Sequence, residues 1–282
     1  MIAKSLLITG CSTGFGRATA LHFAKLGWKV FGTVRKETDR ESLLREIKEG
    51  GNSAEIFLCD IVREAEVQEL GRAVAARCDR LDALVNNAGS AFAAPMELIP
   101  PDILREQLDL NVIAQVAVTQ AVMPLLKAAK GTIINVSSVG GRMTTPMLGP
   151  YSASKHALEA ISDAMRIELA PFGVKVVVIE PGGSPTAIWG TSLKRALAMF
   201  QERHIDLSPY QKLVDVTVAG AEVRSRVGFP PELFAETVEK ILKSPKPAAR
   251  YPIPDSIAWV IRLRRFMPDW AWDAMVRRRV GW

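Results

Sequence analysis

The stretch Ser5-Leu-Leu-Ile-Thr-Gly-Cys-Ser-Thr-Gly-Phe-Gly16 decides the fold of this 282-residue chain. Its first five residues form a short, largely apolar run that stops at Gly10, as a strand buried on both faces does. The glycines Gly10, Gly14 and Gly16 then lead into an amphipathic stretch, residues 17–26. This order predicts a strand, a tight turn and a helix.

A glycine-rich turn between a strand and a helix can cradle a pyrophosphate. Bare backbone lets the phosphates approach closely, and the first N–H groups of the helix point at them. Glycine spacing alone is a weak signal, and the alternative is a plain tight turn. The strand before the turn and the helix after it favour a dinucleotide cradle.

The second predicted strand, Trp28–Val34, ends where dinucleotide-binding folds contact the adenosine ribose. An acid at this point binds a free 2′-hydroxyl, whereas an arginine binds a 2′-phosphate. Here Arg35 and Lys36 follow the strand, and the first acid is Glu37. Arg35, with the Ser12 hydroxyl as a further donor, predicts NADP(H). The alternative is a surface role for Arg35, with Glu37 on the ribose of NAD(H).

Strands and helices alternate regularly as far as Thr186. This alternation predicts an α/β fold with one doubly wound parallel sheet of about seven strands and helices on both faces. Pro124 lies inside an apolar helix and predicts a kink there. The strands after the second are predicted at residues 54–59, 81–85, 132–136, 174–179 and 250–253.

Polar and small residues stand at the carboxyl ends of these strands, where open α/β sheets bind ligands. Asp60 ends the third strand and could accept a hydrogen bond from an adenine amino group, or cap the next helix. Asn86-Asn-Ala-Gly89 ends the fourth strand, as a close approach of the chain to a ligand or as a turn. Ser138 follows the fifth strand.

Tyr151 and Lys155 lie four residues apart in a predicted helix, residues 151–170, and therefore share one face. We expect the ammonium beside the phenol to lower the phenol pKa from about 10. Such a phenol can exchange a proton with a carbonyl or an alcohol near neutral pH. The Ser138 hydroxyl can hold the same oxygen, and Asn111 can fix a water that reaches Lys155. A solvated surface pair is the alternative for Tyr-x-x-x-Lys alone.

Composition argues against several other classes of protein. The net charge is +6, but the basic residues are dispersed outside residues 262–265 and 277–279, so no nucleic-acid partner is expected. The cysteines Cys11, Cys59 and Cys78 and three scattered histidines predict no metal site. The first apolar run starts at once, and no apolar segment has the length of a membrane span, so a cytoplasmic location is expected.

Together these motifs resemble the short-chain dehydrogenase/reductase family, in its subdivision of single-domain oxidoreductases. The resemblance rests on Thr9-Gly-x-x-x-Gly-x-Gly16, Asp60, Asn86-Asn-Ala-Gly89, Asn111, Ser138, Tyr151-x-x-x-Lys155, and Pro181-Gly182 with Thr186. The glycine turn and Gly32-Thr-Val-Arg35 are most similar to members that handle steroids, retinoids and other bulky alcohols or ketones.

The resemblance implies a role for each matching position. Ser138 would polarise a carbonyl, Tyr151 would be the acid/base, and Asn111 would support a water relay. Lys155 would bind the nicotinamide ribose, and Thr186 its carboxamide, although Pro185 is unusual beside it. Homodimers or homotetramers through the helices of Asn111 and Tyr151 are implied as well. The implied cofactor contacts are Gly10, Ser12, Thr13, Gly14, Phe15, Gly16, Arg35, Asp60, Ile61, Asn87, Ala88, Gly89, Tyr151, Lys155, Pro181, Gly182 and Thr186.

The last third is less regular. Residues 187–228 carry apolar positions at helical spacing and predict a lid over the substrate or an ordinary helix pair. We expect one catalytic domain, residues 1–254, and a helical extension, residues 255–282. The extension holds four of the six tryptophans together with two arginine clusters, and Pro268 divides it into two helices. It could contact the substrate mouth, a neighbouring subunit or a membrane surface.

The leading hypothesis is an oxidoreductase that prefers NADP(H), with NAD(H) as the second choice. It would interconvert a secondary alcohol and a ketone or aldehyde in a bulky steroid-, retinoid- or lipid-like molecule. A silent dinucleotide-binding sensor or scaffold is the alternative, and the presence of Tyr151 and Lys155 disfavours it. A sugar-nucleotide epimerase or dehydratase would need a longer chain and another glycine spacing.

Overall fold

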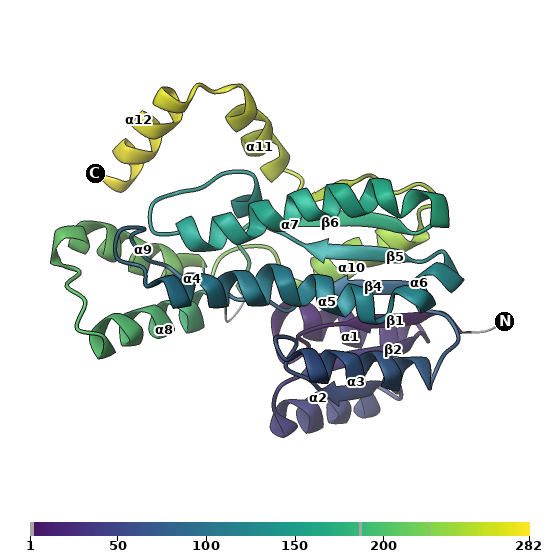
Figure 1. Ribbon diagram of the computed structural model, residues 1–282. Coiled ribbons are helices and arrows are strands. Elements are labelled where there is room, and N and C mark those ends of the chain that lie inside the picture. Colours follow the sequence, from purple (N-terminus) through teal and green to yellow (C-terminus); the bar gives the residue numbers. More distant parts are fainter. Residues whose placement is uncertain (1–2, 186–187, 225) are drawn as a thin grey trace.

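The computed structural model describes residues 3–185, 188–224 and 226–282. Seven parallel strands form one sheet in the order β3-β2-β1-β4-β5-β6-β7, which confirms the predicted doubly wound fold (Figure 1). The strand order reverses between β1 and β4, where such sheets open a ligand crevice. The strands are β1 (Ser5–Ile8), β2 (Lys29–Val34), β3 (Glu55–Leu58), β4 (Ala83–Asn86), β5 (Thr132–Val136), β6 (Lys175–Pro181) and β7 (Arg250–Ile253).

Helices cover both faces of the sheet and then extend beyond it. The sheet-covering helices are α1 (Gly14–Lys25), α2 (Glu37–Glu49), α3 (Glu64–Ala75), α5 (Ala114–Ala121), α6 (Met123–Ala129), α7 (Gly149–Glu168) and α10 (Pro231–Lys243). Further helices of the described residues lie outside the sheet region: α4 (Pro101–Leu108), α8 (Ile188–Glu202), α9 (Gln211–Arg224), α11 (Ile257–Phe266) and α12 (Asp269–Val280). Short 3₁₀ turns join several of these elements, among them η2 (Val139–Gly141) and η4 (Ser208–Tyr210).

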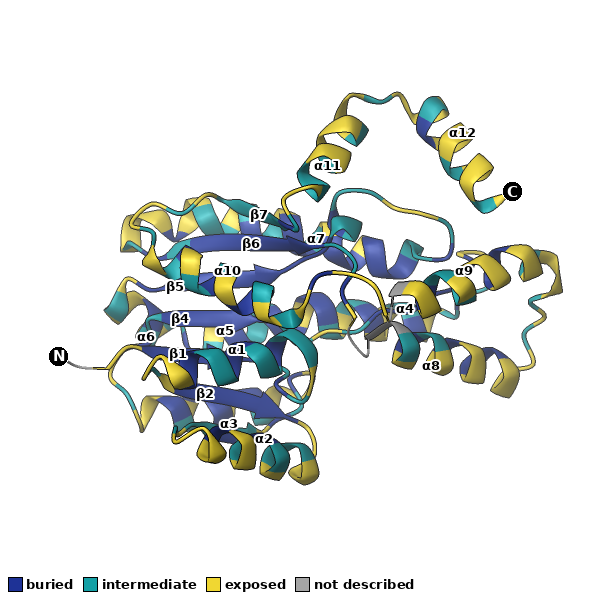
Figure 2. Ribbon diagram, turned by 180° about the vertical axis from the view of Figure 1, so that it is seen from behind, coloured by how far each residue is buried: buried dark blue, intermediate teal, exposed yellow. Residues whose placement is uncertain are grey.

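Two apolar cores hold the layers together, one on each face of the sheet. Successive strand residues point to opposite faces, so Leu6 and Ile8 enter one core while Leu7 enters the other. The first core receives α1, α2 and α10, including the buried Phe23 and Phe234. The second receives α3, α5, α6 and α7. Figures 1 and 2 show these two helix layers from opposite sides.

Several helix boundaries differ from the sequence-based ones. α7 begins at Gly149, two residues before Tyr151, and α2 begins at Glu37 rather than Arg40. The kink predicted from Pro124 is confirmed: the helical run breaks at Val122, and the two parts are bent by 61°. Within the described ranges, no single helix is long and apolar enough to cross a membrane, although this bent pair passes by length and composition.

Helices α8 and α9 form a pair beside the carboxyl edge of the sheet. α8 packs on α4 and the segment after β4 through a small apolar cluster that includes Phe92 and Phe200. α9 packs on the loop before α7, where Leu213 and Val214 meet Met147. The predicted division of the extension at Pro268 is confirmed, because α11 ends at Phe266 and α12 begins at Asp269.

Candidate active site at the carboxyl edge of the sheet

The glycine turn after β1 is too tight for side chains. Gly10 and Gly14 have φ of 73° and 58°, which L-residues with side chains rarely adopt. A Cβ on Gly16 would lie 2.2 Å from the Gly10 carbonyl oxygen. The turn opens directly into α1, whose N-cap is Thr13 in an extended conformation, followed by Phe15 in the first turn. Bare backbone and a helix N-terminus meet here, so these residues fit a pyrophosphate.

Hydrogen bonds tie the glycine turn to the end of β4. The Thr9 hydroxyl accepts from the backbone N–H groups of Asn87 and Ala88, at 3.0 Å each. The Asn87 amide donates to the carbonyls of Thr9 and Gly10, at 2.8 and 3.1 Å. The two strand ends flanking the reversal of strand order are therefore held in fixed positions next to one another.

The residues predicted to meet the adenosine ribose lie at the end of β2. Arg35 is exposed directly after the strand. Glu37 occupies the first turn of α2, where its carboxylate accepts a hydrogen bond from Arg40 at 2.8 Å. Ser12 lies half-buried in the glycine turn. Glu37 thus already has a cationic partner on its own helix, whereas Arg35 faces solvent.

Asp60 follows β3 but does not cap the next helix. The N-cap of α3 is Arg63, so that alternative is wrong. The Asp60 N–H donates to the Glu66 carboxylate at 2.7 Å, which fixes the backbone there. Ile61 is buried in the core beneath it.

Tyr151 and Ser138 meet above the end of β5. Tyr151 lies in the first turn of α7, is buried, and is hydrogen-bonded to the Ser138 side chain. The Ser138 hydroxyl also accepts from the Gly140 N–H at 3.0 Å. A Cβ on Gly140 would lie 3.1 Å from the Tyr151 ring, so the glycine leaves room for the ring.

Lys155 lies one helical turn beyond Tyr151, as predicted, but its ammonium is not beside the phenol. Its Nζ donates to the Val136 carbonyl at 2.8 Å and lies 5.9 Å from the centroid of the Tyr151 ring. Burial lowers the Lys155 pKa to about 8, while the Glu159 carboxylate opposes this shift. Burial also raises the Tyr151 pKa, against a smaller opposite effect of the bond to Ser138.

The predicted lowering of the phenol pKa is therefore wrong in this structure. Removing a phenolate from water is unfavourable, and the Lys155 ammonium, which is held by the Val136 carbonyl, does not offset this cost. The Tyr151 phenol is accordingly neutral near pH 7, and it can act as a proton donor.

Asn111 lies in a π-helical turn, Asp109–Ile113, between α4 and α5. Its amide donates to the Ser90 carbonyl and to the Ser154 hydroxyl, both at 2.9 Å. A Cβ on Gly89 would lie 3.0 Å from the Asn111 Oδ1 and 3.7 Å from the Lys155 Nζ. Asn111 and Lys155 therefore border the same small space beside Gly89.

The remaining predicted contacts lie at the end of β6. Pro181 is the last residue of that strand, and the Gly182 N–H donates to the Ile253 carbonyl at 2.7 Å. A Cβ on Gly182 would collide with Ile257 of α11, so the start of the extension rests on this glycine. Thr186, the predicted carboxamide contact, lies outside the described residues.

The neighbouring helix pair closes over a small apolar cavity of about 10 Å³. The Ser192 hydroxyl of α8 accepts from the Ala91 N–H at 3.3 Å, which ties α8 to the segment after Gly89. The cavity is lined by Ala91, Ala93, Leu148, Ser192, Leu193, Thr217 and Ala221.

A side-chain-free glycine turn at a helix N-terminus, a buried phenol, a hydroxyl and a buried amine thus share one edge of one sheet. Comparison with known proteins agrees with this arrangement, because the family model "short chain dehydrogenase" matches residues 4–196. The chain belongs to the short-chain dehydrogenase family. It is therefore an oxidoreductase of that family, with the Rossmann-like fold described above.

Sequence similarity between this short-chain dehydrogenase and its relatives covers most or nearly all of the chain. It is 34% identical to the uncharacterized oxidoreductase YusZ of Bacillus subtilis (strain 168), over 99% of both chains. It is 37% identical to the NADPH-dependent 3-dehydrocapnine reductase of Ornithobacterium rhinotracheale, covering 88% of this chain and 87% of that protein. A crystal structure of a short-chain dehydrogenase from Streptomyces avermitilis superposes with a TM-score of 0.75 at 26% identity, over 94% and 93% of the chains.

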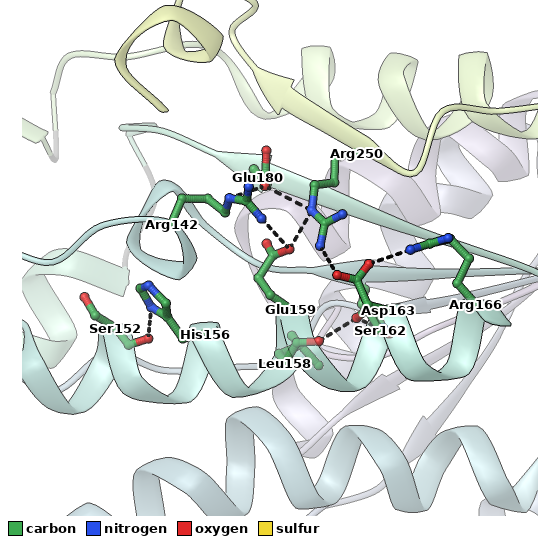
Figure 3. Close-up of polar contacts among 11 residues, drawn as sticks. Arg142, Ser152, His156, Leu158, Glu159, Ser162, Asp163, Arg166, Glu180 and Arg250 are labelled. Carbon is green, nitrogen blue, oxygen red and sulfur yellow. Dashed lines mark hydrogen bonds and ion pairs between the residues drawn. The ribbon is translucent and has the colours of Figure 1, made fainter. Parts of the chain in front are cut away.

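A second charged cluster lies further along α7 of this short-chain dehydrogenase (Figure 3). Arg250 of β7 binds Glu159 at 3.0 Å and Asp163 at 2.7 Å. Arg142 lies 3.8 Å from Glu159 and 3.5 Å from Glu180. Burial, and repulsion from Glu159, raise the Glu180 pKa to about 7, although both arginines oppose the shift. The cluster borders an open cavity of about 520 Å³.

Sequence reasoning missed this cluster and part of the site's hydrogen bonding. Two signals were present: Glu159 stands four residues after Lys155 on the same helical face, and Glu180 interrupts an otherwise apolar strand. No pattern in the sequence predicts the hydrogen bonds that Asn87 and Ala88 donate to Thr9, or the one that Asn111 donates to Ser154. They depend on how distant segments pack.

Proposed function

We propose that this short-chain dehydrogenase prefers NADP(H) and interconverts a secondary alcohol and a ketone or aldehyde in a bulky hydrophobic molecule. One observation carries the proposal. The buried Tyr151 phenol, bonded to Ser138, lies at the same sheet edge as the glycine turn that opens into α1. Phosphate cradle and acid/base group therefore belong to one crevice.

A nicotinamide bound in this crevice supplies or accepts the hydride. Tyr151 gives its proton to the carbonyl oxygen during reduction, since burial keeps the phenol neutral. The Ser138 hydroxyl holds the same oxygen. Lys155, with a pKa of about 8, can return a proton toward Tyr151, and Asn111 borders the space through which a relay water would pass.

The preference for NADP(H) rests on Arg35. It stands exposed at the end of β2, while the acid two residues later is bonded to Arg40. A guanidinium binds a 2′-phosphate in a forked geometry that a carboxylate cannot offer. The relative that reduces 3-dehydrocapnine is also NADPH-dependent by name. The other proposed cofactor contacts are those predicted from the family resemblance.

Replacing Arg35 with Asp should shift cofactor preference toward NAD(H). We expect the ratio of kcat/KM with NADPH to that with NADH to fall at least about 100-fold, because a charged phosphate contact becomes repulsive. Arg45→Asp, an exposed change on α2, is the matched control. An unchanged ratio in the Arg35 variant would show that Arg35 does not bind the phosphate.

The proposed substrate class rests on the apolar lining between α8, α9 and the segment after β4. We propose that residues 187–228 act as a lid on the catalytic domain, residues 1–254. A screen of hydrophobic alcohols and ketones, steroids included, should find turnover by the change in NADPH absorbance. Turnover confined to small hydrophilic carbonyl compounds would contradict this assignment.

We further propose a homodimer or homotetramer built on the helices that carry Asn111 and Tyr151, and a cytoplasmic location. Ile113 and Ile167 are largely exposed on these helices, which fits a partner of the same kind. Sedimentation velocity on the wild type and on Ile167→Asp measures the oligomer directly. A monomeric wild type would refute the oligomer.

A further inference from the structure

The C-terminal extension bridges the sheet and the helix pair. α11 begins against Gly182 at the end of β6, and α12 returns toward η4 and α9 (Figure 1). The Trp282 ring stacks on Tyr210, with centroids 5.9 Å apart. Val280 packs on the apolar cluster of Leu213 and Val214. The extension is therefore held at both of its ends.

Helix α11 exposes apolar side chains to solvent. Trp259, Leu263 and Phe266 follow the spacing i, i+4, i+7 and form one stripe. They are 73%, 57% and 83% exposed, so this apolar stripe faces solvent. The half-buried side of the helix carries Ile257, Ile261 and Arg264, and the last two line the open cavity beside α7. A surface helix of a soluble domain normally turns its apolar side inward.

Helix α12 adds an aromatic ring and charge to the exposed side. Trp272 is buried on the inner side, with the Arg264 guanidinium 5.3 Å from its ring centroid. Trp270 is 75% exposed, and the exposed Arg277 and Arg278 follow it at i+7 and i+8, on its face of the helix. Phe266 and Trp270 lie on either side of the turn between the two helices.

The extension is strongly basic. Residues 255–282 hold six arginines against three aspartates, so this tenth of the chain carries +3 of the net +6. Exposed tryptophans, apolar side chains and arginines on short amphipathic helices are the features that place a helix in the headgroup region of a bilayer. Each arginine near an anionic leaflet adds to the binding.

We propose that the outer side of α11 and α12, defined by Trp259, Leu263, Phe266, Trp270, Arg277 and Arg278, docks on the surface of an anionic phospholipid membrane. Charge decides against a second copy of this chain as the occupant, because two such extensions would bring like charges together. An anionic lipid surface instead complements the arginines while the aromatic rings enter the interface.

Docking would place the substrate side of the enzyme next to the membrane. Since α12 ends on η4 and α9, the lid helices lie beside the docked surface. Uptake of an apolar substrate from the lipid, which such a position would allow, rests on the proposed function. The docking itself does not depend on turnover.

The test is co-sedimentation of the full chain with vesicles, without substrate or cofactor. We expect binding to phosphatidylcholine vesicles containing about 30% phosphatidylglycerol, little binding to pure phosphatidylcholine, and weaker binding at about 0.5 M salt. The triple variant Trp259→Ser, Phe266→Ser, Trp270→Ser should bind at least about 100-fold more weakly. Arg277→Glu with Arg278→Glu should lose about 30-fold or more.

The matched control is Val62→Ser with Phe172→Ser, which removes two half-exposed apolar side chains from elsewhere on the surface. It should bind vesicles like the wild type. Turnover of a water-soluble carbonyl compound without vesicles should be unchanged in the triple variant, so failure of docking is distinguishable from failure of the proposed function. A wild type that stays in the supernatant overturns the proposal. Equal vesicle binding by the triple variant and the wild type also overturns it. So does a wild type that binds no vesicles while the triple variant dissociates an oligomer, because the stripe would then be a subunit contact.

Discussion

Helix α7 carries two groups of ionisable side chains that differ in how their charges are balanced. In its first two turns, Tyr151 and Lys155 face the strand ends with hydrogen bonds to a hydroxyl and a carbonyl. One turn later, Glu159 and Asp163 are paired with the guanidinium of Arg250. One helix thus carries a first group without a direct ion-pair partner and a second group whose carboxylates are paired with arginine.

The difference shows in what burial does to each group. Burial lowers the Lys155 pKa to about 8 and raises that of Tyr151, so both can exchange protons without first breaking a strong ion pair. In the second group, the hydrogen bond from Arg250 lowers the Asp163 pKa against the opposite effect of burial. We infer that the first group serves chemistry and the second holds α7 against β6 and β7.

Lys155→Met should have the largest effect and tests whether the first group serves chemistry. We expect kcat/KM to fall about 10³-fold, because proton return to Tyr151 and the proposed ribose contact are both lost. The folded-state pKa of Lys155 is below its unfolded value, so this lysine costs stability in full at pH 7, and the cost fades as pH rises from about 8 toward 10.5. Urea unfolding at pH 7 should therefore show no marked loss of stability. A variant that is merely unfolded would contradict the chemical role.

Arg250→Met should lower stability and leave turnover nearly unchanged. It leaves Glu159 and Glu180 buried with the longer ion pairs to Arg142, at 3.8 and 3.5 Å, which should lower the free energy of unfolding by about 3 kcal/mol. The kcat of the folded fraction should stay within about threefold of the wild type. Arg166→Met is the matched control, because its exposed pair with the same Asp163 should contribute less than about 1 kcal/mol. Equal stability losses in the two variants would remove the distinction.

A smaller effect is expected from Glu180→Gln. The folded-state pKa of about 7 exceeds the unfolded value near 4.5, so the native chain binds more protons in this window and loses stability as pH rises through it. The glutamine variant should lack this loss and be more stable than the wild type by about 2 kcal/mol at pH 8. Chemical denaturation at pH 5 and pH 8 measures the difference. Parallel pH dependence in both proteins would show that Glu180 does not titrate there.

Much of the sheet could be predicted from sequence, because its signals are local. The runs at residues 132–136 and 250–253 coincide with β5 and β7, and the glycine turn lies where its spacing placed it. Ser138 and Tyr151 meet because one follows β5 and the other opens the next helix. Lys155 stands one turn further along that helix, with its ammonium on the Val136 carbonyl instead of beside the phenol. Local pattern and tertiary packing agree along this part of the chain.

What could not be predicted depends on burial and on distant contacts. The direction of the Tyr151 pKa shift follows from desolvation, which a four-residue spacing does not reveal. The π-helical turn around Asn111 looks like ordinary helix in the sequence. The outward apolar side of α11 shows the same periodicity as an inward one, so only the fold distinguishes them.

The most direct test of the chemical assignment is Tyr151→Phe, which removes one oxygen and keeps the ring. With a carbonyl substrate from the screen, NADPH consumption should fall at least about 10³-fold. NADPH binding, followed by energy transfer from tryptophan, should stay within about threefold of the wild type, since the glycine turn and Arg35 are untouched. Turnover near the wild-type rate in this variant would contradict the role of the phenol as the acid/base group.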